Sequence, residues 1–349
     1  MNKTDINLNW PLLGNLHIVN FLSKSILNNR ISGTYIFAGP DDLGKTTIAN
    51  YFAYSLLCQG KNGKLPCGEC PACNQNQVGK EKLTKEGSVS VHADFHVVKR
   101  EKDKKNISIE QIREFIRSLE MSSFLNSYKI GIIKHAESLS EEAANALLKT
   151  LEEPKKSVVV ILITSELESL PKTIISRSQV LRFFPVKMEV IYNYLINTFG
   201  VSRSLAKNLS RISLGRPALA VKFLEDKDFY ETYLKRVKAF LAFGREDINS
   251  RFALVNDLFD SKITGQEATK LAARILSVWQ GMLRDLFLVN LGEIDLVQHE
   301  VVINELQSLK SVFSLARLVK LSELLTQAEV YLKSNVNPRL VLEEVAMSI

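Results

Sequence analysis

The feature that most constrains the fold of this chain is the stretch 39–73, which joins a phosphate-binding pattern to four cysteines. Residues 39–46 fit the pattern GxxxxGK[ST]. In such a loop, backbone N–H groups point at the β-phosphate of a nucleotide, the lysine neutralises phosphate charge, and the hydroxyl ligates magnesium. Residues 35–37 are typical of a strand that enters the loop, and residues 46–57 of the helix that follows it. This arrangement predicts one strand–loop–helix unit of a parallel α/β sheet.

The rest of the first half alternates strand and helix patterns, as a parallel sheet flanked by helices requires. Helical patterns cover Ile109–Leu119 and Glu141–Glu153, and we expect Ser140 to cap the second helix and Pro154 to end it. After about Pro185 the strand patterns stop and the remainder is predicted to be helical. The strands are expected at Thr34–Ala38, Phe95–Val98, Lys129–Ile133, Val158–Ile163 and Val180–Phe184.

The phosphate loop has every residue that its pattern requires, but it differs from related phosphate loops at one further position. Related loops usually carry glycine where this chain has Asp42. Glycine reaches positive φ freely, whereas aspartate does so less well, and Asp41 and Asp42 both place negative charge beside phosphates. We therefore expect ATP with Mg²⁺ to bind weakly. The candidate binding residues in this segment are Gly39, Gly44, Lys45, Thr46 and Thr47.

Hydrolysis of ATP requires more than the loop. An acidic pair at the end of a neighbouring strand normally positions magnesium and polarises the attacking water. The best candidate strand, 129–133, is followed by Lys134 and His135 where the acids should stand. Glu137 comes two or more residues too late to substitute cleanly, and His135 is typical of a surface or packed histidine. Little or no ATPase activity is expected of this chain by itself.

The four cysteines have the spacing of a metal site. Cys58-x8-Cys67-x2-Cys70-x2-Cys73 lies in a loop rich in glycine and proline, which lets a tight hairpin close around tetrahedral zinc. Four protein ligands leave no open position, so the zinc should be structural. An iron–sulfur cluster and reduced cysteines without metal are the alternatives. Because the chain has no other cysteine, a scattered disulfide framework is excluded.

The bulk composition places few further limits. A chain of 349 residues can hold two or three domains. Its net charge of +7 suits contact with a polyanion and equally suits an ordinary basic protein. Met1–Trp10 lacks the apolar core of a signal peptide, and the longest apolar run, Val158–Ile163, has the length of a strand. We expect a cytoplasmic protein with no membrane association.

Several segments together resemble the AAA+ subunits of bacterial replicative clamp loaders, most closely the delta-prime family. The most specific is Ala144-Asn145-Ala146-Leu147-Leu148-Lys149-Thr150-Leu151-Glu152-Glu153-Pro154, with Ser176-Arg177-Ser178 following at the expected distance. The resemblance covers residues 10–225 well and the rest loosely. Other matching segments are Trp10-Pro11-Leu12-Leu13-Gly14, residues 35–40, the four cysteines, Ser108–Arg113 and Asn335–Leu340.

The resemblance implies roles for three residues outside the phosphate loop. Arg177 matches the arginine finger that reaches into a neighbouring subunit's ATP site and stabilises charge on the γ-phosphate. Ser178 replaces the usual cysteine of that motif, which leaves the arginine itself intact. Thr164 matches the polar residue that senses the γ-phosphate, and Arg216 stands where the lid domain's sensor arginine would be.

The resemblance also implies an architecture of three domains. Residues 1–185 would form the AAA+ sheet domain with a zinc module at 58–73, residues 186–228 a small helical lid, and residues 229–349 an all-α collar for oligomerisation. Apolar stripes in Ala268–Leu288 and Leu315–Leu332 are long enough to pack against partner helices, although packing within the domain explains them equally well.

Two roles within the family remain to be separated. Motor subunits carry the acidic pair and an early Tyr-Arg-Pro motif, both missing here. The expectation is a non-hydrolysing stator in a hetero-pentamer with motor (gamma/tau) and delta subunits, loading the sliding clamp onto primer–template DNA held through its backbone phosphates. Arg113 and Arg117 are candidates for phosphate contact, or simply solvated charges. The alternatives are a motor-type ATPase with weakened catalysis and a stand-alone AAA+ DNA-binding or repair protein.

Overall fold

The computed structural model describes residues 10–60, 64–76, 93–101, 104–121, 128–152, 155, 157–259, 263–334 and 336–349. The chain divides into two compact units. The first comprises Met1–Val190 with Gly215–Ala218, and the second comprises Ile191–Leu214 with Leu219–Ile349.

The first unit is built on a five-stranded parallel sheet with the order β2-β3-β4-β1-β5. Each strand coincides with a predicted one to within about two residues at either end. Because the sheet is parallel, the carboxyl ends of its strands share one edge, where β1 leads into the phosphate loop. The strands are β1 (Thr34–Ala38), β2 (Phe95–Val98), β3 (Lys129–Lys134), β4 (Val158–Thr164) and β5 (Gln179–Arg182).

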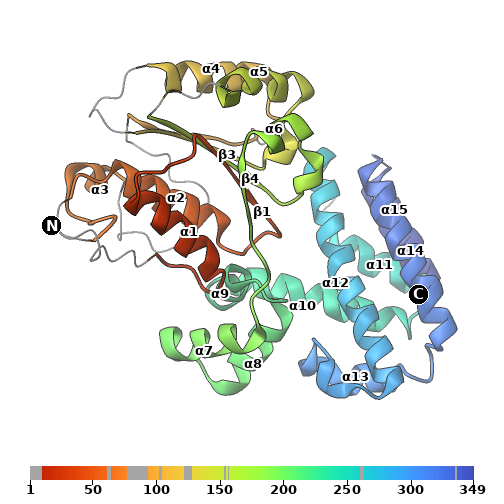
Figure 1. Cartoon of the computed structure of the whole chain (residues 1–349). Helices are drawn as coiled ribbons and strands as arrows, with labels where there is room; N and C mark the ends of the chain where they lie inside the picture. Colours follow the sequence, from red (N-terminus) through yellow and green to blue (C-terminus); the bar gives the residue numbers. More distant parts are fainter. Residues whose placement is uncertain are drawn as a thin grey trace. The chain divides into compact units, whose positions relative to one another are not determined.

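Helices cover both faces of the sheet. On one face lie α1 (Leu16–Leu27) and α2 (Lys45–Leu57), and on the other α4 (Ile109–Glu120) and α5 (Glu141–Glu152) (Figure 1). Alternate residues of β1 serve the two layers: Tyr35 and Phe37 join the core under α1 and α2, while Ile36 and Ala38 join the core under α4 and α5. The predicted α/β fold class is confirmed.

Local signals in the sequence explain where two of these helices begin. Ser108 and Gln111 form a reciprocal capping box at the start of α4. At the start of α5 the Ser140 hydroxyl accepts a hydrogen bond from the N–H of Ala143, as predicted for an N-cap. The expected stop at Glu153 and Pro154 lies outside the described residues.

Short elements complete the first unit. They are α3 (Pro71–Gln75), α6 (Lys172–Ser176) and the one-turn 3₁₀ helices η1 (Ala136–Ser138) and η2 (Leu167–Ser169). Two of them carry candidate site residues, because α3 follows Cys70 and α6 ends at Arg177.

The second unit contains only helices among its described residues, as the sequence predicts after Pro185. The two predicted apolar stripes fall within α12 and α14, which pack against each other. The proposed boundary between lid and collar at residues 228/229 stays a prediction, and Asn335 lies outside the described residues. The helices from the end of the sheet unit onward are α7 (Met188–Phe199), α8 (Arg203–Ile212), α9 (Pro217–Glu225), α10 (Lys227–Phe243), α11 (Ile248–Leu258), α12 (Gly265–Leu291), η3 (Ile294–Leu296), η4 (Glu300–Val302), α13 (Ile303–Ser308), α14 (Leu315–Lys333) and α15 (Pro338–Ser348).

None of the helices in the described ranges combines the length and the apolar character needed to cross a membrane.

Candidate functional site

The phosphate loop connects β1 to α2 and contains three residues with positive φ. Gly39 (φ 140°) lies so close to the carbonyl of Phe183 that a Cβ atom would collide with it, and Gly44 (φ 87°) precedes the first turn of α2. Asp42 adopts φ 63°, the left-handed conformation that glycine adopts more easily. The loop therefore keeps its geometry at the cost of local strain at Asp42.

Lys45 is held by its own loop. Its side chain is only 5% exposed, and its Nζ donates hydrogen bonds to the carbonyl oxygens of Gly39 and Pro40. Asp41 Oδ1 lies 3.4 Å from the same nitrogen. Burial lowers the pKa of Lys45, and the nearby carboxylate of Asp41 opposes that shift. Any phosphate bound here would have to exchange with these contacts of the amine.

A pocket of about 170 Å³ opens beside the loop. It includes four of the predicted loop residues and Thr164, but Gly39 and Arg216 are not among the residues that line it. Thr164 is buried at the end of β4, and its hydroxyl donates to the carbonyl of Glu166 and accepts from the Glu166 N–H. The lining consists of Asp41, Asp42, Gly44, Lys45, Thr46, Thr47, Lys134, His135, Ile163, Thr164, Ser165 and Ala218.

The segment that carries Arg216 is fixed to the sheet unit on both sides of this residue. The N–H of Ala218 donates to the carbonyl of Asp42 at 3.1 Å, and the carbonyl of Gly215 accepts from the N–H of Val186 at 2.7 Å. The first of these bonds ties the phosphate loop to the start of α9. Ala218, two residues beyond the predicted sensor arginine, is thus the residue of this segment that reaches the pocket.

The expected acidic pair is replaced by nitrogen bases, as the sequence indicates, and both of them line the pocket. His135 has φ 55° and is the left-handed residue that precedes η1, the short helix that contains Glu137. One oxygen of Glu137 lies 3.3 Å from His135 Nδ1 and accepts a hydrogen bond from Ser165 Oγ at 3.1 Å, while the other oxygen is buried and has no hydrogen-bond partner among the described residues.

The charges of this pair are coupled. Burial alone would raise the pKa of Glu137, but the hydrogen bond with His135 and bonding to the backbone outweigh it and lower the pKa to about 2. The hydrogen bond to Glu137 raises the pKa of His135, although part of that effect is cancelled by desolvation. Glu137 is therefore a carboxylate at neutral pH and favours a protonated His135.

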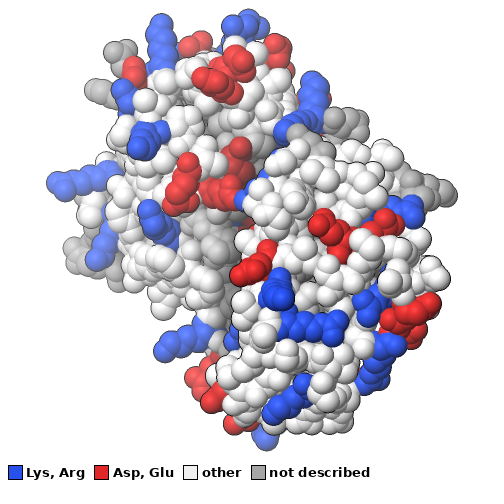
Figure 2. Space-filling model, turned by 90° about the vertical axis from the view of Figure 1, so that its right-hand side faces the viewer, with Lys and Arg blue, Asp and Glu red and all other residues white. Residues whose placement is uncertain are grey.

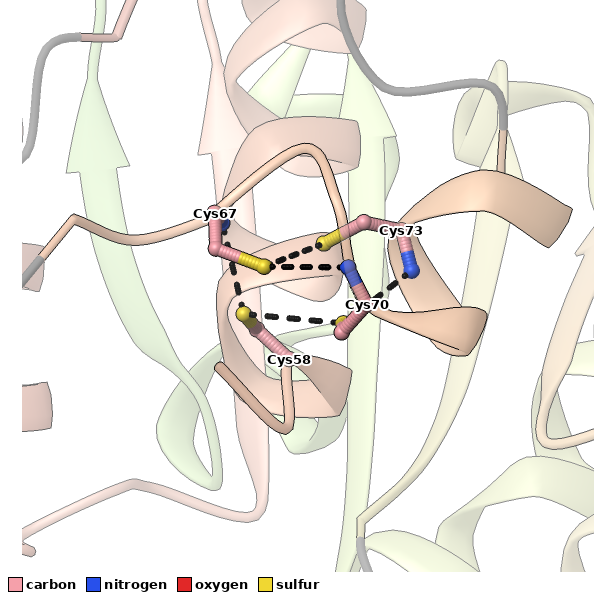
Figure 3. Close-up of side chains that lie close together, drawn as sticks. All are labelled: Cys58, Cys67, Cys70 and Cys73. Atoms are coloured by element: carbon pink, nitrogen blue, oxygen red, sulfur yellow. Dashed lines mark hydrogen bonds between the residues drawn. The ribbon is translucent and has the colours of Figure 1, made fainter. Parts of the chain in front are cut away.

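The four cysteine sulfur atoms converge on one point (Figure 3). All four lie within 4.8 Å of one another, with Cys58 Sγ 4.0 Å from Cys70 Sγ and Cys67 Sγ 3.8 Å from Cys73 Sγ. A tetrahedral zinc with Zn–S bonds of about 2.3 Å would place its sulfur ligands about 3.8 Å apart. Four sulfur donors at this spacing fit a single tetrahedral metal ion. The distances between the sulfur atoms are too long for a disulfide bond.

Backbone N–H groups support the thiolates of this cluster. Cys58 Sγ accepts from the N–H groups of Gly60 and Cys67, Cys67 Sγ from that of Cys70, and Cys70 Sγ from that of Cys73. Although desolvation opposes it, hydrogen bonding lowers the pKa of Cys67 to about 6, whereas burial raises the pKa of Cys58 and Cys73. Thiols held so close together favour a cation that converts them into thiolates.

The two candidate sites sit at opposite ends of one helix. Lys45 is the first residue of α2, and Cys58 is its C-cap. The cysteine loop is also attached to the sheet domain through Trp10, whose indole N–H donates to the carbonyl of Leu65 at 3.2 Å while its ring packs edge-on against Phe52. A structural metal would therefore fix the far end of the helix that begins at the phosphate loop.

Arg177 is exposed and already oriented. It is the C-cap of α6, and its Nη2 lies 2.8 Å from Glu152 Oε1 at the end of α5. Its Nη1 donates to the carbonyl of Thr173 at 3.1 Å and to Ser176 Oγ at 3.4 Å. The side chain is 37% exposed, so the guanidinium can reach a partner without leaving a buried position.

Sequence reasoning missed two contacts in this region. Glu152 belongs to the motif that carried the resemblance, but its pairing with Arg177 is evident only when α5 and α6 are placed side by side. Ser165 follows Thr164 directly and donates a hydrogen bond to Glu137, which lies just after the left-handed residue His135. The partners of each pair lie far apart in the sequence, so no local pattern indicated either contact.

Charged side chains of both signs are exposed on the described part of the chain. In the face shown in Figure 2, both basic and acidic side chains are exposed. Arg113 and Arg117 are exposed on α4, which agrees with solvated charges and with phosphate contacts alike.

Comparison with known proteins identifies the family. Residues 14–187 match the family model described as "DNA polymerase III, delta subunit". The chain is 31% identical over 235 residues to the DNA polymerase III subunit delta' of Bacillus subtilis, an alignment that covers 67% of each protein. The chain belongs to the delta-prime family of DNA polymerase III clamp-loader subunits.

Other members of the clamp-loader group are also similar. The tau subunit of DNA polymerase III from Bacillus subtilis is 33% identical over 180 residues, which are 52% of this chain and 30% of tau. A solved Thermotoga maritima protein related to the DNA polymerase III gamma subunit superposes with a TM-score of 0.50 at 18% identity, covering 93% of this chain and 96% of that one. That likeness confirms the fold. Since both delta' and tau are matched, the family alone leaves the role within the complex open.

Proposed function

We propose that this delta-prime family member is the non-hydrolysing stator of its clamp loader and that Arg177 completes the ATP site of a neighbouring motor subunit. The observation that carries the proposal is an asymmetry between the two halves of an ATPase site. The residue that acts in trans, Arg177, is present and exposed. The carboxylates that act in cis are replaced by Lys134 and His135.

The contacts of Arg177 suit the task of an arginine finger. A planar guanidinium matches the geometry of phosphate oxygens, and a donor that is oriented in advance stabilises developing charge better than a mobile one. Glu152 and the end of α6 hold the guanidinium while leaving it exposed. Approach of a γ-phosphate would replace Glu152, one anion exchanging for another.

The proposed partners follow from this role. They are motor (gamma/tau) and delta subunits in a hetero-pentamer, the sliding clamp, and primer–template DNA contacted through backbone phosphates, which makes DNA binding salt-dependent. The four cysteines would hold one structural Zn²⁺, which needs no open coordination position. Nucleotide binding by Gly39, Gly44, Lys45, Thr46, Thr47, Thr164 and Arg216 is proposed to be weak, and the protein is proposed to act in the cytoplasm.

The direct test is the DNA- and clamp-stimulated ATPase rate of a reconstituted loader that contains this subunit as wild type, Arg177→Ala or Arg177→Lys. Loss of an arginine finger typically costs on the order of 10³-fold at the site it serves. We expect a large fall for Arg177→Ala, and little rescue by Arg177→Lys because lysine lacks the bidentate fork. Gel filtration must show intact assembly. An unchanged rate would reduce the subunit to a scaffold.

One observation favours the motor-type alternative. Glu137 is an ionised carboxylate beside the pocket, and one of its oxygens is buried without a hydrogen-bond partner among the described residues. If Glu137 replaced the missing acids, the isolated chain would turn over ATP and Lys45→Ala would abolish that activity. DNA binding at physiological salt by the isolated chain would instead favour a stand-alone DNA-binding protein.

A further inference from the structure

The residues at the carboxyl end of β3 fit poorly with the magnesium ion that a phosphate loop implies. Mg²⁺ requires oxygen ligands in near-octahedral geometry at about 2.0–2.1 Å and is usually held through one or two carboxylates. At this position the chain offers the amine of Lys134 and the imidazole of His135. A cationic amine repels the metal instead of binding it.

The nearby oxygen atoms do not make up for this difference. The Thr164 hydroxyl is engaged in both directions with Glu166. Glu137 directs one oxygen to His135 and Ser165 and is not among the residues that line the pocket. Asp41 lies 3.4 Å from Lys45 Nζ. Thr46, which also lines the pocket, carries the hydroxyl that a phosphate loop normally offers to magnesium.

We propose that this pocket binds the diphosphate or triphosphate of a nucleotide without magnesium, with Lys134 and His135 supplying the positive charge that the metal would otherwise provide. Together with Lys45 they place three nitrogen groups around the pocket, and the hydroxyls of Thr46 and Thr47 add hydrogen-bond donors. The proposal rests on the proposed function, because a phosphate group held in this way lacks the metal and the acid that hydrolysis needs.

The surroundings of the pocket set the strength and selectivity of such a site. A volume of about 170 Å³ suits a phosphate tail and leaves the base and sugar outside. Glu137 and Asp41 favour a protonated His135, Arg100 opposes it, and Lys134 adjoins it. Asp41 and Asp42 also face the ligand. Because Lys45 must leave the Gly39 and Pro40 carbonyls, we expect affinities in the micromolar to millimolar range rather than tight binding.

The test is calorimetric titration of the 349-residue chain, loaded with zinc, with ADP and with pyrophosphate. Buffers are freed of divalent cations on a chelating resin before the protein is added, since a soluble chelator would also attack the cysteine site. Wild type should bind both ligands without magnesium, and 5 mM Mg²⁺ should weaken binding or leave it unchanged. ADP that binds only with magnesium, or neither ligand binding up to several millimolar, would overturn the proposal.

Two variants sharpen the result. Lys134→Asp should weaken magnesium-free binding at least tenfold, whereas Lys187→Asp, the same change at an exposed lysine outside the pocket, should not. The double variant Lys134→Asp/His135→Glu, which restores an acidic pair, should bind ADP only when magnesium is present. Circular dichroism must show that each variant is folded.

A third variant tests whether Glu137 binds magnesium. If wild-type binding required magnesium and Glu137→Gln abolished it, Glu137 would be the metal ligand and the proposal would be wrong. A failure of this proposal can be told apart from a failure of the stator role, because Arg177 does not line this pocket and the Arg177 variants of the reconstituted loader leave the pocket unchanged.

Discussion

The candidate sites at the two ends of α2 differ in how many of their required residues are present. At Cys58 a complete set of four sulfur ligands converges with the spacing of a tetrahedral metal site. At Lys45 the loop keeps its backbone and its lysine, but Lys134 and His135 stand at the end of β3 where an acidic pair would be needed to complete the site. A structural metal site requires all its ligands at once, whereas a phosphate loop can retain its shape after losing catalysis. A complete sequence pattern is therefore weaker evidence of activity than a complete site.

The largest effect is expected from removing one sulfur ligand of the cysteine cluster, the complete site of the two. Cys70→Ser should lower the zinc content from one ion per chain to well below that and weaken zinc affinity at least a hundredfold, since structural zinc sites bind with about 10–16 kcal/mol. The sheet should remain folded, because its two hydrophobic clusters lie between sheet and helices. Zinc analysis, competition with a chromophoric chelator and circular dichroism measure these effects.

The matched control is Glu69→Gln, an exposed change in the turn between two of the cysteines. It should leave zinc content unchanged. If Cys70→Ser kept its zinc, or if wild type contained iron instead, the proposed zinc site would be wrong.

The next largest effect is expected beside the phosphate loop, the incomplete site, and concerns the free energy of unfolding. Glu137→Gln should destabilise the chain by about 2–4 kcal/mol near pH 6, because the folded state lowers the pKa of Glu137 from 4.5 to about 2. A depressed carboxyl pKa stabilises above the unfolded value and loses that effect as the pH falls from about 4.5 toward 2. His135, whose pKa is raised from 6.5, adds stability below 6.5 that is lost at higher pH.

Chemical unfolding of wild type and Glu137→Gln between pH 2 and 8 measures this difference, which should be greatest at about pH 5–6.5 and vanish near pH 2. Glu168→Gln, an exposed glutamate in η2, serves as the control. A difference that does not depend on pH would mean that the Glu137–His135 contact contributes nothing.

A smaller effect is expected from alanine substitutions at two glycines near the cysteines, one of which lacks space for a side chain while the other has an unusual backbone angle. A Cβ atom at Gly60 would lie 2.6 Å from Cys67 Sγ, while one at Gly68 would meet no atom within 4 Å. Gly60→Ala should weaken zinc binding about tenfold or more. Gly68→Ala should cost only about 1 kcal/mol of backbone strain, because its φ is 81°. Equal zinc affinities in the two variants would contradict the convergence described for this cluster.

The smallest effect on stability is expected at Glu152. Its pairing with Arg177 is exposed, so Glu152→Gln should change the unfolding free energy by less than about 1 kcal/mol. In a reconstituted loader the same change should lower the ATPase rate severalfold, because Arg177 loses its orientation. Thermal unfolding and steady-state kinetics test both parts. A rate equal to wild type would show that Glu152 does not position the arginine.

Much of the fold was predictable because it depends on local patterns. The runs of β-branched residues in β3 and β4 are buried throughout, and each has the length of one strand. Ser140 caps α5 as its residue type predicts. The cysteine cluster was equally accessible, because its ligands are close in sequence.

The rest of the site depends on contacts between distant segments. Glu137 was rejected from its position in the sequence, yet it lies just after a left-handed residue, His135, and accepts a hydrogen bond from Ser165. Arg177 was recognised from its motif, but not its ion pair with Glu152 on another helix. Thr164 reaches the pocket as expected, while Ala218 rather than Arg216 is the lining residue from its segment.

The most direct test of the central claim compares two single variants of this subunit in the same reconstituted loader. DNA- and clamp-stimulated ATP hydrolysis is measured with Lys45→Ala and with Arg177→Ala, each in otherwise wild-type complexes of verified assembly. Our prediction is a rate close to wild type for Lys45→Ala and a large fall for Arg177→Ala, because the proposed role of this chain is to supply an arginine to a neighbour without hydrolysing ATP itself. A large fall for Lys45→Ala with an unaffected Arg177→Ala complex would contradict it.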